Sequence, residues 1–320
     1  MKYTRCLGID KDWSVLTMGC WQLAPSIGWG DKCSATEAET VIKTAVDCGI
    51  TAFDTAEGYG DGESERRLGR ALGNKRDDVI IVSKIWPDAE LTLEAYQKRL
   101  DETLLRLNRD YVDLYLIHWP SDFMQNASLF CDIMFALKES KKALTVGLSN
   151  FHEQDLELLG DQLADFSINQ VPYNLLCRFY EGRTRELCHQ SGVTYMAYAP
   201  LARGFLARKL TETDRQVAAR TNRYDSFFDE PIKSEVAKVY DLLASIGQDL
   251  GRHPSEIALA WVIAQENIQT TIIGSRKPEQ VKECAKAGDC ELTAEMLQAL
   301  TAASDRFVAN TERVLQSPID

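Results

Sequence analysis

Four side chains near the ends of apolar segments could together protonate a carbonyl oxygen: Asp54, Tyr59, Lys84 and His118. A tyrosine hydroxyl has an ordinary pKa of ~10, too high for easy proton donation and return near neutral pH. A neighbouring ammonium stabilises the phenolate, so we expect Lys84 to lower the pKa of Tyr59. Burial would strip Lys84 of its charge unless a carboxylate such as Asp54 holds it. With His118 orienting the substrate oxygen, the set predicts a general acid aimed at a carbonyl that gains negative charge, and it requires no metal.

The carbonyl must also receive a nucleophile, and the sequence offers no obviously primed cysteine or serine. Hydride from a nicotinamide cofactor would serve. The Rossmann fingerprint is absent, because residues 58–62 are glycine-rich but Glu63 stands where G-x-G-x-x-G requires its last glycine. A dinucleotide would therefore have to bind through other loops.

The segment IIGSRKPEQVKE, residues 272–283, fits such a loop. Gly274 lets the backbone approach a phosphate, and Ser275 and Arg276 can contact it. A helix that begins at Pro278 would point its N-terminus at the same anion.

Short apolar runs alternate along the chain with amphipathic stretches, a pattern typical of repeated βα units. The predicted strands are 15–18, 50–53, 79–83, 112–117, 145–148, 167–170, 194–197 and 270–273. The predicted helices are 36–48, 93–107, 129–139, 153–159, 184–190, 233–250, 254–265 and one from Pro278, and the stretch 53–72 also ends in a charged helical pattern. Eight units with strands buried on both faces favour an α/β fold, a closed (β/α)8 TIM barrel, over a doubly wound open sheet.

Polar residues follow seven of the eight predicted strands, which packing alone does not explain. The carboxyl ends of barrel strands meet on one rim, where active sites lie. The residues at these ends, in order, are Cys20-Trp21, Asp54, Lys84, His118, Ser149-Asn150, Gln170, Tyr198 and Gly274-Ser275-Arg276.

We expect one domain over residues 1–320, with a hairpin around residues 8–11 capping the barrel floor. An extra helix is expected after Ala294, with a frayed end at 317–318. The interval between the last two strands is far longer than the others, and long loops are often functional lids. Its loop, 203–231, is either a solvated surface or a basic clasp over an anionic ligand. The basic residues in this loop are Arg203, Arg208, Lys209, Arg215, Arg220 and Arg223.

The 320-residue chain has a mass of 36.0 kDa, a net charge of -12 and a pI near 5.0, which disfavours nucleic acid as a partner. No signal peptide and no apolar run of membrane-spanning length is found. Nine scattered cysteines without a C-x-x-C pair indicate reduced thiols and a cytoplasmic location. Cys188-His189 is interpreted as a helix end rather than a metal site.

Several motifs, in order along nearly the whole chain, resemble those of the aldo-keto reductases. They are D-T-A-E-G-Y (54–59), V-S-K ending at Lys84, L-I-H-W-P around His118, G-L-S-N (147–150), Gln170, Y-A-P-L (198–201) with Arg203-Gly204, and I-I-G-S-R-K-P-E-Q. The resemblance is closest to the bacterial general-stress and inositol-locus type reductases, and more distant to potassium-channel β subunits. It implies a (β/α)8 barrel and NADP(H)-dependent reduction of carbonyl compounds, with Tyr59 as the proton donor.

The resemblance also implies a cofactor site and a substrate site. The nicotinamide carboxamide would be held by Ser149, Asn150 and Gln170, with Tyr198 stacked on the ring, Arg203 on the pyrophosphate, and Ser275 and Arg276 on the 2′-phosphate. Further residues expected around the cofactor are Cys20, Trp21, Asp54, Pro200, Leu201, Gly274, Gln280, Glu283 and Cys284. Cys284 replaces the asparagine that is frequent in the family. Trp21, Trp86 and Trp119 would line the substrate pocket with Tyr59 and His118.

Two alternatives remain beside the reductase. One uses Lys84 as a Schiff-base nucleophile of a lyase, although Asp54 would keep that amine protonated. The other is a regulatory or sensor protein that binds NADP(H) and makes little use of its reductase site. For the reductase we expect a small carbonyl substrate and a monomer or weak oligomer. The loop 25–32 would be specific to this chain, which leaves the substrate open.

Overall fold

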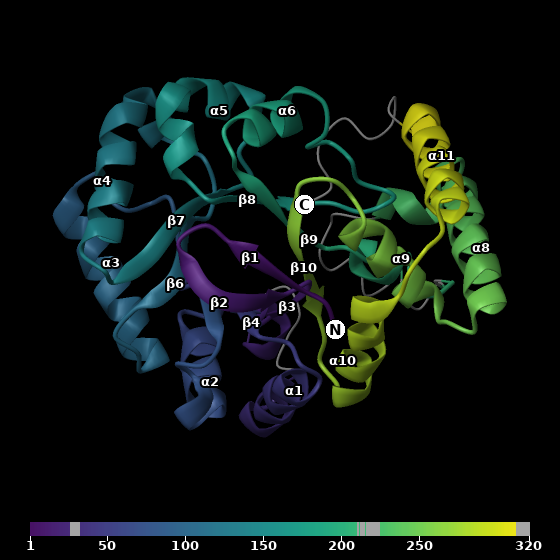
Figure 1. Cartoon of the computed structure of the whole chain (residues 1–320), viewed down its shortest axis with the longest axis horizontal. Coiled ribbons are helices and arrows are strands. Elements are labelled where there is room, and N and C mark those ends of the chain that lie inside the picture. Colours follow the sequence, from purple (N-terminus) through teal and green to yellow (C-terminus); the bar gives the residue numbers. More distant parts are fainter. Residues whose placement is uncertain (26–32, 210, 212–214, 216–224, 312–320) are drawn as a thin grey trace.

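Eight parallel strands close into a barrel at the centre of the molecule (Figure 1). The computed structural model describes residues 1–25, 33–209, 211, 215 and 225–311. The spatial strand order is β10-β3-β4-β5-β6-β7-β8-β9, and β10 pairs with both β3 and β9. The (β/α)8 prediction is therefore confirmed, and the open sheet is excluded. The barrel strands are β3 (Leu16–Gly19), β4 (Ala52–Asp54), β5 (Ile80–Ile85), β6 (Val112–Ile117), β7 (Ala143–Ser149), β8 (Ile168–Pro172), β9 (Thr194–Tyr198) and β10 (Ile268–Gly274).

Helices surround the barrel, and each predicted boundary lies within two residues of the observed one. The start signal at Ser34 is a true capping box: the Ser34 hydroxyl accepts the Glu37 N–H, and the Glu37 carboxylate accepts the Ser34 N–H. The helices are α1 (Ala35–Asp47), α2 (Glu63–Leu72), α3 (Leu93–Leu107), α4 (Ala127–Glu139), α5 (Glu153–Leu159), α6 (Arg183–Gln190), α8 (Ile232–Leu250), α9 (Pro254–Ile263), α10 (Pro278–Ala285) and α11 (Ala294–Thr311).

A two-stranded hairpin of β1 (Tyr3–Cys6) and β2 (Ile9–Ser14) closes the amino-terminal end of the barrel, as predicted. Its buried side chains Cys6, Ile9 and Trp13 form one apolar cluster with inward-facing residues of the barrel strands. Full burial of each large apolar side chain stabilises the fold by about 1.5–3 kcal/mol. This packing excludes water from the floor.

A buried ion network fastens the hairpin to that floor. Lys11 Nζ lies 2.9 Å from Asp113 Oδ1 and donates to the Val79 carbonyl at 2.8 Å. Arg109 donates to Asp113 Oδ2 at 2.9 Å, and the Ile81 N–H donates to the same oxygen. Asp113 is fully buried, and these donors satisfy its carboxylate.

The predicted C-terminal helix, α11, packs along α8 at one side of the barrel (Figure 1). Leu243 of α8, Trp261 of α9 and Phe307 of α11 belong to one apolar cluster. The predicted frayed end at 317–318 lies outside the described residues. Among the helices that the structure describes, none is both long enough and apolar enough to cross a membrane.

Candidate active site

The barrel brings the predicted polar strand ends together at its carboxyl-terminal rim. Asp54 is the last residue of β4, Lys84 lies in β5, and His118 follows β6 directly. Backbone hydrogen bonds also join neighbouring strand ends beyond the strands themselves. The His118 N–H donates to the Ile85 carbonyl, and the Asn150 N–H donates to the Gln170 carbonyl. Asp54, Lys84, His118 and Gln170 are buried, whereas Tyr59 keeps part of its surface exposed.

Lys84 is the fully buried hub of this rim. Its Nζ lies 2.8 Å from both Asp54 carboxylate oxygens, 2.8 Å from the Thr55 carbonyl and 3.2 Å from the Tyr59 hydroxyl. Burial acts to lower the pKa of Lys84, but the Asp54 carboxylate and Tyr59 outweigh burial and raise the pKa above its ordinary value. Lys84 is therefore a charged ammonium whose three protons are all committed.

The prediction that Lys84 brings the pKa of Tyr59 below its ordinary value is wrong. Burial raises the pKa of Tyr59, Lys84 lowers it and Asp54 raises it, and the net direction is upward. The cost of placing a phenolate in this poorly solvated site exceeds the attraction of one ammonium that Asp54 already neutralises. Tyr59 is thus a neutral phenol at neutral pH. Because its oxygen accepts from Lys84, its own O–H can donate elsewhere.

His118 is a neutral imidazole. Burial, and after it the Lys84 ammonium, holds the pKa of His118 well below its ordinary value. Nδ1 is buried and has no hydrogen-bond partner in the described part of the chain, so we place the single ring proton on Nε2. The ring meets Tyr59 and Trp86 edge-on, with centroid separations of 5.6 and 5.0 Å. These contacts fix the plane of the imidazole.

A chain of hydrogen bonds joins the next strand ends to this set. Gln170 Nε2 donates to Asp54 Oδ2 at 2.8 Å. Asn150 Nδ2 donates to the His118 carbonyl at 3.1 Å and to Ser149 Oγ at 3.2 Å, and Tyr198 donates to Asn150 Oδ1 at 2.9 Å. The three side chains predicted to hold a carboxamide therefore lie side by side and adjoin the acid set.

The loop after β9 has an unusual backbone. Ala199, Ala202 and Arg203 have φ values of 51, 46 and 55°, in the left-handed region that non-glycine residues rarely adopt. Asn174 secures the bend by donating to the Ala199 carbonyl at 2.9 Å. The Arg203 guanidinium lies 5.8 Å from the Trp21 ring centroid, so the bend directs this cation across the rim. Pro200 and Leu201 form the turn between these residues.

The loop after β10 fits an anion. Ser275 is buried and its hydroxyl has no partner among the described residues, so a polar ligand would satisfy it. The Arg276 N–H donates to Gln280 Oε1 at 3.0 Å, and α10 begins at Pro278 as predicted. Gly274 is needed for close contact, because a Cβ there would lie 2.3 Å from the Gln22 amide. Sequence reasoning missed Gln22, whose contact with Gly274 arises only on barrel closure.

Glu283 and Cys284 of α10 face different surroundings. Glu283 Oε1 accepts from Ser255 Oγ at 2.8 Å and lies 3.1 Å from His253 Nδ1. Cys284 packs in the main apolar cluster, and burial raises the pKa of its thiol to about 12. Cys284 is thus a neutral core thiol in this structure, and the amide contacts of an asparagine are not available to it.

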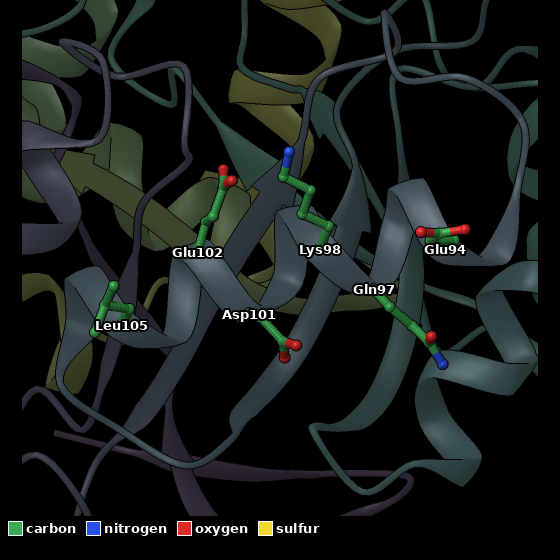
Figure 2. A pocket seen from close by; sticks show the side chains of 6 residues that line it. All are labelled: Glu94, Gln97, Lys98, Asp101, Glu102 and Leu105. Atoms are coloured by element: carbon green, nitrogen blue, oxygen red, sulfur yellow. The ribbon is translucent and has the colours of Figure 1, made fainter.

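The Trp86 ring packs against His118, Trp119 directly follows His118 in the chain, and the Trp21 ring lies near the Arg203 guanidinium. All three keep part of their surfaces exposed, and their place in the substrate pocket stays a prediction. Glu57 and Arg99, which sequence reasoning missed, lie behind Trp86. The only hint in the sequence was that Glu57 shares its loop with Tyr59. A hollow of about 420 Å³ lies elsewhere, on the outer face of α3 (Figure 2). All side chains that line this hollow belong to α3, so none of the rim groups lines it.

Lys209 and Arg215, two basic residues of the described part of the loop 203–231, pair with different carboxylates. Lys209 pairs with Asp241 at 2.8 Å, and Arg215 pairs with Asp229 at 3.0 Å. Arg208 is exposed. Arg220, Arg223 and residues 26–32 of the predicted pocket loop lie outside the described residues. The described part therefore resembles a solvated surface more than a clasp.

No group of three ligating side chains that could hold a metal ion occurs within the described ranges. Cys188 is buried near the end of α6, which confirms its interpretation as a helix end. The model of the aldo/keto reductase family matches residues 15–305. This chain belongs to the aldo/keto reductase family.

Relatives of this aldo-keto reductase span nearly its whole length. It is 29% identical to aldo-keto reductase YhdN of Bacillus subtilis over 305 residues, covering 92% of this chain and 91% of that protein. It is 28% identical over 322 residues to the NADH-specific methylglyoxal reductase of Escherichia coli, covering 91% and 97%.

Solved structures agree. The glycerol dehydrogenase of Gluconobacter oxydans superposes with a TM-score of 0.82 at 26% identity, covering 99% of this chain and 97% of that one. An aldo/keto reductase of Klebsiella pneumoniae in complex with NADP and acetate gives a TM-score of 0.72 at 27% identity and covers 94% of each chain.

Proposed function

We propose that this aldo-keto reductase reduces aldehydes and ketones to alcohols with NADPH. The observation that carries the proposal is the hydrogen bonding of Lys84. Its ammonium donates to Asp54, to the Thr55 carbonyl and to the Tyr59 oxygen, which leaves the Tyr59 proton free to go to a substrate.

The chain's own residues would act as follows. Tyr59 donates its proton to the carbonyl oxygen, and Lys84 stabilises the phenolate that remains. Neutral His118 donates from Nε2 to the same oxygen and orients it. Asp54 keeps Lys84 charged, and Gln170 restrains Asp54 through its amide. The tryptophans give the carbonyl compound an apolar wall.

NADPH, when bound, supplies the hydride. Ser149, Asn150 and Gln170 would hold its carboxamide, and Tyr198 would stack on the ring. Arg203 would contact the pyrophosphate and Ser275 with Arg276 the 2′-phosphate, which favours NADPH over NADH. Cys20, Trp21, Asp54, Pro200, Leu201 and Gly274 would line this site, with Gln280, Glu283 and Cys284 at the adenosine end. The Klebsiella relative was crystallised with NADP, and the Escherichia coli relative is named NADH-specific.

The geometry disfavours the Schiff-base alternative. A lysine that attacks a carbonyl must be accessible and unprotonated, whereas Lys84 is fully buried and its pKa is raised. No observation favours a sensor over an enzyme. All nine cysteines are free thiols, which supports a reducing, cytoplasm-like location. A monomer or weak oligomer remains our expectation.

The proposal is tested by following NADPH oxidation at 340 nm with a panel of small aldehydes, ketones and diketones. We expect turnover with several of them and a much higher kcat/KM with NADPH than with NADH. No oxidation of either cofactor with any member of the panel would contradict the proposal.

A further inference from the structure

Glu57 stands between Asp54 and Tyr59 in the sequence of the loop that follows β4. Its side chain is only 7% exposed. Arg99 of α3 grips it with two donors: Nε lies 2.8 Å from Oε2, and Nη2 lies 2.5 Å from Oε1. Such a fork fixes the orientation of a carboxylate as well as its position. Neither Glu57 nor Arg99 has a part in the proposed proton transfer or in holding the cofactor.

A third donor connects Glu57 to the neighbouring loop. The backbone N–H of Trp86, directly after β5, donates to Glu57 Oε1 at 2.6 Å. In return, the Glu57 N–H donates to the Lys84 carbonyl at 3.3 Å. Arg99 also donates to Asp88 at 3.0 Å, so Glu57 and Arg99 together restrain the segment from Trp86 to Asp88.

The two loops that Glu57 joins carry the two groups that must meet at one carbonyl oxygen. Tyr59 lies two residues after Glu57. The Trp86 ring packs edge-on against His118 at 5.0 Å, and an atom added at Gly58 would lie 3.7 Å from the same ring. Displacement of Trp86 would therefore release the plane of the His118 imidazole, and displacement of the Glu57 loop would move the phenol.

We propose that Glu57, oriented by Arg99, is a positioning residue for carbonyl reduction: it holds Trp86 against His118 and holds the loop of Tyr59, so that both donors converge on one oxygen. The inference deepens the proposed function and depends on it. Glu57 itself contacts neither the Tyr59 hydroxyl nor Lys84 Nζ by any bond described here. Its effect on the rate passes through the geometry of those groups.

The chain contains a matched control seven positions further along α3. Arg106 Nε donates to Glu65 Oε2 at 2.5 Å, and Ser83 of β5 donates to Glu65 Oε1 at 2.6 Å. This second pair also joins the β4–α2 region to α3 and β5, and Glu65 is fully buried. Neither Glu65 nor Arg106 hydrogen-bonds an aromatic residue of the rim within the described ranges.

The experiment compares Glu57→Gln with Glu65→Gln. Glutamine keeps the size of the side chain but turns an amide N–H toward each guanidinium, so both variants are expected to melt at lower temperature. Glu57→Gln is expected to lower kcat about 10-fold or more, since small misplacements of reacting groups are costly. The dissociation constant for NADPH should stay within about two-fold, because Glu57 is not among the residues proposed to contact the cofactor. Glu65→Gln should keep kcat per folded molecule within about two-fold.

A second readout needs neither cofactor nor turnover. The chain has four histidines, so the His118 Hε1 resonance can be assigned by its loss in His118→Gln. In the cofactor-free protein, Glu57→Gln should shift this resonance as the Trp86 ring moves, and Glu65→Gln should leave it in place. Wild-type kcat with an unmoved His118 resonance in Glu57→Gln would overturn the inference, even if the variant melts early.

Should Glu57→Gln fail to fold, Arg99→Lys replaces it, since lysine keeps the charge but loses the fork. We expect an intermediate loss of kcat and a smaller shift of the His118 resonance, and no change in either would overturn the inference. If the wild type reduces no carbonyl compound, the proposed function fails. The His118 resonance then still reports whether Glu57 positions Trp86.

Discussion

The two ends of the barrel each hold a lysine that is paired with a buried carboxylate, and the two pairs have different roles. At the floor, Lys11 and Asp113 lie 2.9 Å apart beneath the hairpin, with Arg109 as a second cation. At the rim, Lys84 and Asp54 lie 2.8 Å apart, and the third group is the partly exposed phenol of Tyr59. A buried ion pair is therefore not itself the mark of an active site. What distinguishes the rim is an acid that retains a proton and faces outward.

The largest expected effect on activity comes from removing the acid at the rim. Tyr59→Phe removes the transferable proton and should lower kcat by about 10²–10⁴-fold, the usual contribution of a general acid. NADPH binding should stay within a few-fold, and the melting temperature should change little, because the ring and its packing remain. Steady-state kinetics with calorimetric NADPH titration checks both. Unchanged turnover would mean that Tyr59 is not the acid.

Removing the buried carboxylate at the floor should instead lower the stability and leave the activity unchanged. Asp113→Asn leaves Lys11 and Arg109 without their carboxylate, and loss of one partner of a buried pair typically costs about 3–5 kcal/mol. Urea denaturation should show this loss in the free energy of unfolding. The kcat per folded molecule should remain that of the wild type. A large fall in kcat with unchanged stability would erase the distinction between the two ends.

A third variant sharpens the role of the rim loops. Arg276→Ala should raise the dissociation constant for NADPH about 10-fold or more, because a hydrogen bond to a charged group contributes about 1.5–3 kcal/mol. The dissociation constant for NADH, which lacks the 2′-phosphate, should change less than about three-fold. Equal effects on both cofactors would show that Arg276 does not recognise that phosphate.

The smallest expected effect is the pH dependence due to His118. Its pKa in the folded protein lies well below the ordinary 6.5, so between those values the unfolded chain binds the proton more readily. The contribution of neutral His118 to the stability of the folded protein is therefore present above pH ~6.5 and is lost as the pH falls. Between pH 6.5 and 5.5 the loss should be about 1 kcal/mol, and His118→Gln should abolish that part. Identical pH dependence in wild type and variant would contradict a neutral, buried His118.

The sequence predicted the rim far better than the floor. Asp54 and Lys84 lie at the carboxyl ends of apolar strands and His118 directly follows one, so strand order and barrel closure sufficed to bring them together. Asp113 lies inside a strand and Lys11 on a hairpin, and no local pattern links residues so far apart. The pKa of Tyr59 was mispredicted because burial is a property of the whole fold. The partners of Glu57 were equally hidden, since α3 approaches its loop only in three dimensions.

The ionisation of Tyr59 is the most direct measurement of the central claim. Carbon-13 labelling of the tyrosine Cζ gives a resonance that reports the protonation state of each phenol, and Tyr59→Phe assigns the relevant signal. We expect the pKa of Tyr59 in the cofactor-free protein to lie above 10, and to rise further in Lys84→Met because the stabilising ammonium is gone. A Tyr59 that ionises below pH 10 would contradict the conclusion that burial outweighs the ammonium at this site. A pKa of Tyr59 that is the same with and without Lys84 would contradict the role of Lys84 in stabilising the phenolate of the proposed acid.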